Sequence, residues 1–259
     1  MRVPLLRLFG LGILAAATLL AAGCNSSALD SSDTTPQTAT GVWTGTDAVT
    51  GLVVTAIITS GGEATFIRSD GLQFVGAVQV SGSTLAATVD GYPDFNQTFS
   101  DGSTYGIGTL SGTVTTASTI SATLSFTTND NTSITGTWSL TYDSLSTNAS
   151  SVTTIAGTYT DSSSGATFTF SSAGAISITN SPDGCSLTGT ISTADTTHDI
   201  YEVAYTYSGC TGTYEPLNGV QLTGLATLNS SLSPAQVVMT ATGTLNGNYY
   251  GIISTLTAT

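Results

Sequence analysis

The chain has no lysine and little charge of either sign. Only 7% of its 259 residues are charged, and three basic residues, Arg2, Arg7 and Arg68, stand against sixteen acidic ones. Proteins bind nucleic acid mainly by placing Lys and Arg against phosphates. Nucleic acid is therefore excluded as a partner. The same shortage argues against polybasic docking on anionic lipid.

Histidine and cysteine are also scarce, which removes most catalytic and metal sites. His198 is the only histidine, so a Ser/His/Asp triad would have to use it. The flanking segment Asp195–Asp199 is polar and typical of a solvated turn between strands. One His and three Cys cannot readily supply the three or four N or S ligands of a transition-metal site. We therefore predict that the chain is not an enzyme and has no catalytic residue, cofactor or metal.

Two sites built from carboxylates remain as weaker alternatives, a calcium site and the catalytic pair of a glycosidase. Asp90–Asp94 and Asn129–Asn131 are acidic segments that we expect to be loops, but neither follows a calcium-loop pattern, so solvated turns are the simpler interpretation. Glu202 and Glu215 are candidates for the paired carboxylates of a glycosidase only by elimination. Since Glu202 alternates with apolar residues on both sides, we expect it to face solvent.

The first 23 residues predict a signal peptide. A cationic start precedes an apolar core from Leu8 to Leu20, which is too short to span a bilayer comfortably. The sequence Leu20-Ala21-Ala22-Gly23-Cys24 resembles the lipobox of bacterial lipoproteins, although that family usually has Leu where this chain has Ala21. The resemblance implies that Cys24 is lipidated and becomes the mature N-terminus. The alternative is a plain secretory peptide.

The residues after Cys24 bear on location. Asn25 stands where such lipoproteins carry their sorting signal, and inner-membrane retention typically uses Asp there. The resemblance therefore implies a bacterial outer-membrane lipoprotein, with the membrane as its partner through the acyl chains of Cys24. Residues 24–40 then comprise the lipidated Cys and a flexible tether rich in Ser and Thr.

Threonine, serine and glycine replace the missing charge, with 29 glycines in the chain. Thr favours the half-exposed face of a strand, and Gly marks turns. The apolar period is two, which predicts strands rather than helices. One such face holds Ile120, Ala122, Leu124 and Phe126, and another holds Tyr201, Val203, Tyr205 and Tyr207.

The sequence also repeats itself. Thr40–Thr44 recurs as Ala156–Thr160 at an offset of 116, and Thr135–Leu140 falls against Tyr250–Thr255 at an offset of 115. We infer duplication of a unit of about 105 residues, although Thr/Gly-rich strands can look alike by chance. The first unit is predicted over 41–146 and the second over 155–259, with Asp143–Thr154 as the join.

About eight strand runs in each half predict the architecture. The fold class is all-β, with two tandem antiparallel up-and-down β-barrel-like units, because closing a meander removes its exposed edges. Two β-sandwiches, or one sheet continuous across both halves, remain as alternatives. In the barrel interpretation, the first half borrows no strand and should fold alone from Thr40 to about Ser146.

A short motif resembles a known family. Gly41-Val42-Trp43 is similar to the Gly-x-Trp at the first strand of lipocalins and other calycins such as the avidins. The resemblance implies a barrel with the Trp closing one end. Lipocalins pair that Trp with an Arg late in the domain, whereas Arg68 is early in the first half. The second half has Tyr159 in place of the Trp.

Cys185 and Cys210 are predicted to form a disulfide. Both lie in the second half of a chain that we expect to be exported, where disulfides persist. The bridge would close a loop of about 25 residues, contributing roughly 3 kcal/mol in the chain-entropy model. The alternative is a pair of unpaired buried thiols.

Two functions remain. The first is a noncatalytic envelope lipoprotein that acts as an interaction or structural module, with an envelope protein as partner. The alternative is a calycin-like carrier that binds one small apolar ligand inside a β-barrel. Because aromatic residues on strands are more often core than ligand cage, the first function is favoured. The ligand-binding candidates for the carrier are Trp43, Trp138, Tyr201, Tyr205 and Tyr207.

Overall fold

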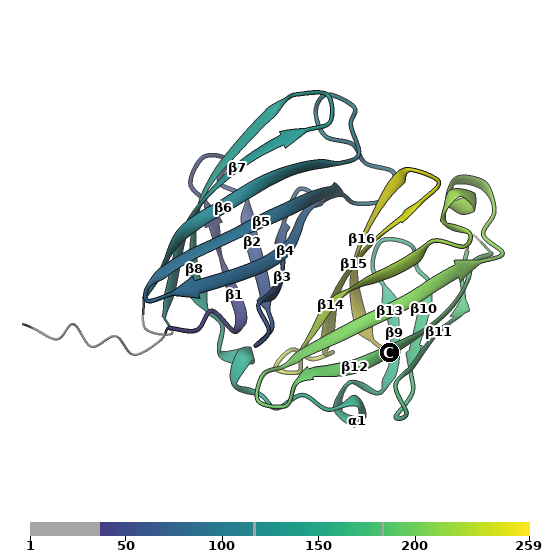
Figure 1. Cartoon of the computed structure of the whole chain (residues 1–259). Coiled ribbons are helices and arrows are strands. Elements are labelled where there is room, and N and C mark those ends of the chain that lie inside the picture. The colour runs from purple at the N-terminus through teal and green to yellow at the C-terminus, as the bar shows by residue number, and fades with distance from the viewer. Residues whose placement is uncertain (1–36, 116–117, 183) are drawn as a thin grey trace, which may run out of the picture. The chain divides into compact units, whose positions relative to one another are not determined.

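A computed structural model describes residues 37–115, 118–182 and 184–259. These residues form two tandem closed barrels, each of eight antiparallel strands in up-and-down order (Figure 1). The prediction of an all-β chain with two barrel-like units is confirmed. Neither the sandwich arrangement nor a sheet shared by both halves is present in the described residues.

The first barrel closes where its first strand pairs with its last. The register runs from Trp43 opposite Tyr142 to Asp47 opposite Trp138. Its strands β1 to β8 span Gly41–Asp47, Val53–Ile58, Glu63–Arg68, Leu72–Ser81, Thr84–Pro93, Gly106–Thr115, Thr119–Thr128 and Ser133–Tyr142.

The second barrel closes in the same way, between β9 and β16. Tyr159 lies opposite Ala258, and Asp161 lies opposite Leu256. The short helices are η1 (Ser144–Thr147) and α1 (Val152–Ile155) between the barrels and η2 (Gly212–Leu217) after β13. Strands β9 to β16 span Gly157–Asp161, Thr167–Phe170, Ala175–Asn180, Ser186–Asp195, Ile200–Ser208, Gln221–Asn229, Gln236–Leu245 and Asn248–Ala258.

Alternation along each strand builds the interiors. On β7 the apolar residues from Ile120 to Phe126 are buried, and the Ser and Thr between them are exposed. Glycines allow close approach of neighbouring strands: a Cβ on Gly112 would lie 2.1 Å from the carbonyl oxygen of Ser121. Asn246 and Gly247 turn the β15–β16 hairpin with φ of 53° and 81°, the conformation of a tight two-residue turn.

Each barrel has its own apolar core. The first is filled by large rings, including Trp43, Phe66, Phe74, Phe126 and Trp138. The second contains Phe168, Phe170 and three tyrosines of β13 among aliphatic residues. An eight-stranded barrel is just wide enough for its side chains to fill it. These two cores use that width for packing.

A third apolar cluster joins outward-facing residues of the two barrels. Val42, Ile57 and Ile67 come from the first barrel, and Ile200 and Leu225 come from the second. All five side chains are buried. The described residues accordingly cluster as one compact unit. The barrels therefore share apolar contacts although neither borrows a strand from the other.

Polar contacts supplement this cluster beside the seam of the second barrel. The backbone N–H of Ile253, which lies before the stretch of β16 that pairs with β9, donates to Asp94 Oδ1 at 2.9 Å. Gln73 Nε2 donates to the carbonyl oxygen of Ile252 at 3.3 Å. Strand β9 has five residues where β1 has seven. Side chains of the first barrel thus form hydrogen bonds with the part of β16 that the short strand β9 does not reach.

The two first strands are held in equivalent ways. Trp43 Nε1 donates to the carbonyl oxygen of Ala39 at 2.8 Å, and the Tyr159 hydroxyl donates to that of Ile155 at 3.0 Å. Trp43 and Tyr159 are 116 residues apart, as are their closing partners Tyr142 and Ala258. The offset of 115 predicted for the last strands is therefore wrong by one residue. A shift of one would exchange inward and outward side chains.

Two further boundaries differ from expectation. The predicted loop Asp90–Asp94 is wrong for its first four residues, because β5 continues to Pro93, opposite Leu72 on β4. Pro93 is tolerated there because it ends the strand. At the N-terminal side, Ala39 and Thr40 are buried against the first barrel although the sequence assigned them to the tether.

Candidate functional site

A small pocket lies at the mouth of the second barrel, the end at which β9 finishes. Its volume is about 60 Å³, and it is partly open to solvent. The wall combines the carboxylates of Asp94 and Asp161 with the phenol of Tyr207 and the rings of Phe95 and Tyr214.

Both carboxylates are fixed by hydrogen bonds through Oδ1. Asp161 ends β9, and its Oδ1 accepts from the backbone N–H and hydroxyl of Ser163, at 2.8 and 2.6 Å, and from Ser164 N at 2.8 Å. Asp94 directly follows β5, and its Oδ1 accepts from Ile253 N. The strand ends therefore determine where the acids of the pocket lie.

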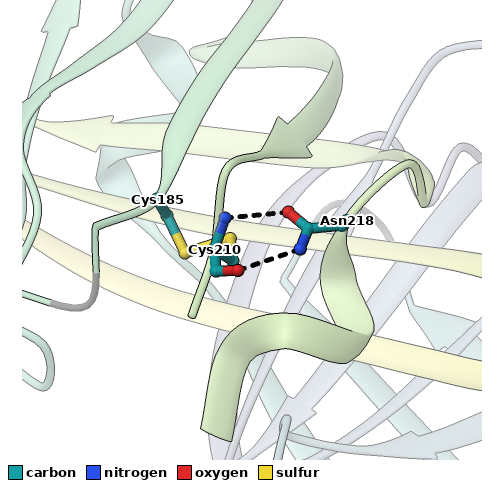
Figure 2. The surroundings of a disulfide bond; sticks show 3 residues. All are labelled: Cys185, Cys210 and Asn218. Carbon is teal, nitrogen blue, oxygen red and sulfur yellow. Dashed lines mark hydrogen bonds between the residues drawn. A yellow bond between two sulfur atoms is a disulfide. The ribbon is translucent and has the colours of Figure 1, made fainter. Parts of the chain in front are cut away.

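The disulfide predicted from the sequence is present and borders the pocket. Cys185 is bonded to Cys210, which precedes η2 (Figure 2). Asn218 holds the other end of the loop between β13 and β14. Its Oδ1 accepts from Cys210 N at 2.8 Å, and its Nδ2 donates to Cys210 O at 2.9 Å. Leu217, the last residue of η2, is fully buried in the second core. The β13–β14 loop is thereby fastened over the barrel mouth.

The pocket has a negative electrostatic environment. Burial raises the pKa of Asp94, and the nearby Asp161 carboxylate raises it further, while hydrogen bonds from the backbone of Ile253 and Phe95 oppose the rise. Burial also raises the pKa of Tyr207, and the charge of Asp161 adds to that rise. No Lys or Arg is among the described lining residues. Arg68, the only cation after residue 7, is bonded within the first barrel.

The hydroxyl of Tyr207 has no hydrogen-bond partner among the described residues. Its side chain is 7% exposed and lines the pocket. Among the described residues, nothing hydrogen-bonds its hydroxyl, and only the neighbouring acids and Tyr214 influence its pKa besides burial. A buried hydroxyl is normally paired with protein or water. This hydroxyl therefore has hydrogen-bonding capacity available to the pocket.

The five predicted ligand-binding aromatics do not meet in one place. Trp43 and Trp138 belong to the first core, whereas Tyr201, Tyr205 and Tyr207 belong to the second. Only Tyr207 also borders the pocket. Their role in holding an apolar ligand stays a prediction.

The segment around His198 is a turn, as expected. His198 Nδ1 lies 3.0 Å from Asp195 Oδ2, and the hydroxyl of Thr197 donates to Asp195 Oδ1 at 2.6 Å. Asp199 differs from the expectation of a solvated turn, because it is only 2% exposed. Burial raises its pKa to about 6, and the neighbouring Tyr201 hydroxyl opposes the rise only in part.

Sequence reasoning missed the polar groups inside the barrels. Asp47, Arg68 and Asp161 are buried at strand ends, like Asp199. Arg68 donates from Nε and Nη2 to Asp70 at 2.9 and 2.8 Å, and its Nη1 lies 3.8 Å from Asp47 Oδ2. The alternation of side chains along the strands could have placed two of them inside. Asp47 is four positions from the inward-facing Trp43, and Asp199 is two positions from the inward-facing Tyr201.

The remaining candidates are placed as follows. Glu202 and Glu215 are exposed, and Asn129–Asn131 lies in the β7–β8 turn. Within 37–115, 118–182 and 184–259, no group of three His, Cys, Asp or Glu side chains is arranged to hold a metal ion. No helix formed by these residues has the length and apolar content needed to cross a bilayer. Cys24 and the signal peptide lie outside the described residues.

Comparison with known proteins adds no relative. No family model matches the chain, and no curated protein matches it significantly.

Proposed function

We propose that this chain is a noncatalytic lipoprotein of the bacterial envelope whose two barrels act as a structural or interaction module. One observation carries the proposal: the barrel interiors are filled by their own side chains. Trp43, Phe66 and Trp138 are completely or almost completely buried in the first core, as are Phe168 and Tyr201 in the second. A filled interior leaves the outer faces and loops as the surfaces for contact.

The size of the pocket supports this function over that of an apolar carrier. Sites for small molecules typically enclose about 300–1,000 Å³ and bury most of the ligand. The pocket at the second barrel mouth has about 60 Å³ and carries two carboxylates. An apolar ligand would have to displace packed core rings to enter either barrel, and each displaced ring would lose its buried contacts.

Membrane anchoring rests on the lipobox resemblance at Cys24. A diacylated and N-acylated Cys supplies two or more chains, and stable anchoring needs at least two such signals. The Cys24→Ser variant should move to the soluble fraction of a host with two membranes. Its mass should lack the acyl groups. Asn25→Ser is the matched control and should remain in the membrane. A Cys24→Ser protein that stays membrane-bound with unchanged mass would refute the anchor.

The choice between module and carrier is tested on the released variant. Exported Cys24→Ser protein is purified without detergent, extracted with organic solvent and examined by mass spectrometry. Because this variant carries no anchor, any stoichiometric lipid in the extract must come from the fold. We expect none. Recovery of one apolar molecule per chain would overturn the module and support the carrier.

A further inference from the structure

The pocket at the second barrel mouth has chemistry that the envelope-module function does not use. Two carboxylates, Asp94 and Asp161, approach the same space of about 60 Å³. Like charges brought together without a counter-ion disfavour each other's ionised form. Here the Asp161 charge contributes to the raised pKa of Asp94. A cation in the pocket would relieve this repulsion.

A second observation points to a ligand that donates hydrogen bonds. Tyr207 is more than nine-tenths buried and lines the pocket, and no described residue bonds its hydroxyl. The hydroxyl oxygen has lone pairs that can accept, and carboxylates accept strongly from charged donors. Three acceptor groups therefore converge on a space to which no described side chain contributes a cation.

Aromatic rings complete the wall. Phe95 packs against Tyr214 with ring centroids 5.3 Å apart, and both line the pocket. The faces of such rings attract cations, most strongly where water is partly excluded. Bare metal ions prefer a shell of six to eight oxygen ligands or dedicated N and S donors. Aromatic walls instead suit an ammonium group with a short carbon chain.

We propose that the mouth of the second barrel binds a small primary amine. Its ammonium group lies between Asp94 and Asp161 and donates to the Tyr207 hydroxyl, and its carbon chain contacts Phe95 and Tyr214. The volume limits the bound part to the ammonium group and a few carbons. This site lies at the rim of the barrel, so it does not require the packed core to open.

The test is calorimetric titration of the purified full chain in detergent with ethylammonium chloride. A ligand this small should bind in the millimolar range. Sodium chloride and ethanol serve as the cation without carbon and the neutral analogue, and both should bind at least about tenfold more weakly. A second amine, the amide of Nα-acetyl-lysine, shows whether an ammonium group at the end of a side chain also enters. If this amide binds, the ligand can be an ammonium group at the end of a side chain. If it does not bind, the ligand is a free small amine.

Two variants test the assigned groups. Asp94→Asn keeps an oxygen to accept from Ile253 N but removes the charge, so affinity for ethylammonium should fall about tenfold. Tyr207→Phe should reduce it about threefold. Asp130→Asn removes an equal charge from the exposed β7–β8 turn and should leave it unchanged. No saturable binding of ethylammonium, equal binding of sodium, or equal losses in Asp130→Asn and Asp94→Asn would each overturn the proposal.

Discussion

The two barrels have the same strand order and closure but stabilise their interiors differently. The first has both tryptophans of the chain and places its one arginine, Arg68, near the buried Asp47. The second has three tyrosines on β13, a disulfide and the buried Asp199, with no Lys or Arg among its described residues. The β meander therefore fixes the barrel, while the side chains that fill its core and the bonds that fasten its loops can vary.

The largest expected effect comes from separating the barrels. The first half alone, from Gln37 to Ser146, should fold with a cooperative transition because all eight of its strands are its own. Its free energy of unfolding should be lower than in the full chain by about 4 kcal/mol, since Val42, Ile57 and Ile67 lose their apolar partners. Tryptophan fluorescence in urea measures this, because both tryptophans are in the first barrel.

A matched variant separates lost contacts from general damage. Ile57→Thr should destabilise the full chain, where the side chain is buried against the second barrel, and should have little effect on the first half alone. Equal destabilisation in both would show that Ile57 contributes within the first barrel only. An unfolded first half would show that the two barrels form one obligatory folding unit.

The next effect concerns the disulfide of the second barrel. Replacing Cys185 and Cys210 together by Ser should reduce stability by about 3 kcal/mol, because the unfolded chain regains the freedom of the loop between them. Near-ultraviolet dichroism of tyrosine reports mainly on the second barrel, which has most of the tyrosines. Its unfolding midpoint should fall more than that of tryptophan fluorescence. Equal shifts by both probes would mean that the barrels unfold as one unit.

A smaller, pH-dependent effect comes from Asp199. Its pKa of about 6 in the fold exceeds the usual value near 4, so between these values the folded state holds a proton that the unfolded state has lost. The free energy of unfolding should therefore decrease by about 2 kcal/mol as pH rises from 4 to 6, and then level off. Asp199→Asn should make this decrease smaller, leaving the part due to the raised pKa of Asp94, and be more stable than the wild type at pH 7.

The control for this prediction is an exposed carboxylate in the other barrel. Asp130→Asn changes the net charge equally but should leave the decrease between pH 4 and 6 in place. Denaturant unfolding followed at pH 4, 5, 6 and 7 makes the comparison. A wild-type protein whose stability rises over this range would contradict a buried Asp199 with a raised pKa.

Much of this fold follows from local sequence patterns, namely the alternation of apolar residues along strands and the residues that favour turns. Alternation identified the buried faces of β7 and β13, and Gly and Asn identified the turns. The disulfide between Cys185 and Cys210 was predicted because Cys24 has another role and because disulfides persist in exported proteins. The one-residue error in the repeat offset arose because Gly-rich strands match in either register, and only the pairing of β1 with β8 and of β9 with β16 distinguishes the faces.

The site was harder to foresee. Asp94 and Asp161 are 67 positions apart in the sequence, and they line one pocket only because β5 and β9 end near β16. Contacts of that kind depend on tertiary packing and have no local signature. Asp199 could have been placed inside by parity, but its position next to a polar turn favoured solvent exposure.

The most direct test is whether either barrel can admit an apolar ligand. The Cys24→Ser protein is titrated with a fluorescent fatty-acid analogue, and both the emission of the probe and that of Trp43 and Trp138 are followed. We expect no saturable binding and unchanged tryptophan emission, because packed side chains fill both cores. Saturable binding of one molecule per barrel, with tryptophan quenching in the first, would contradict it.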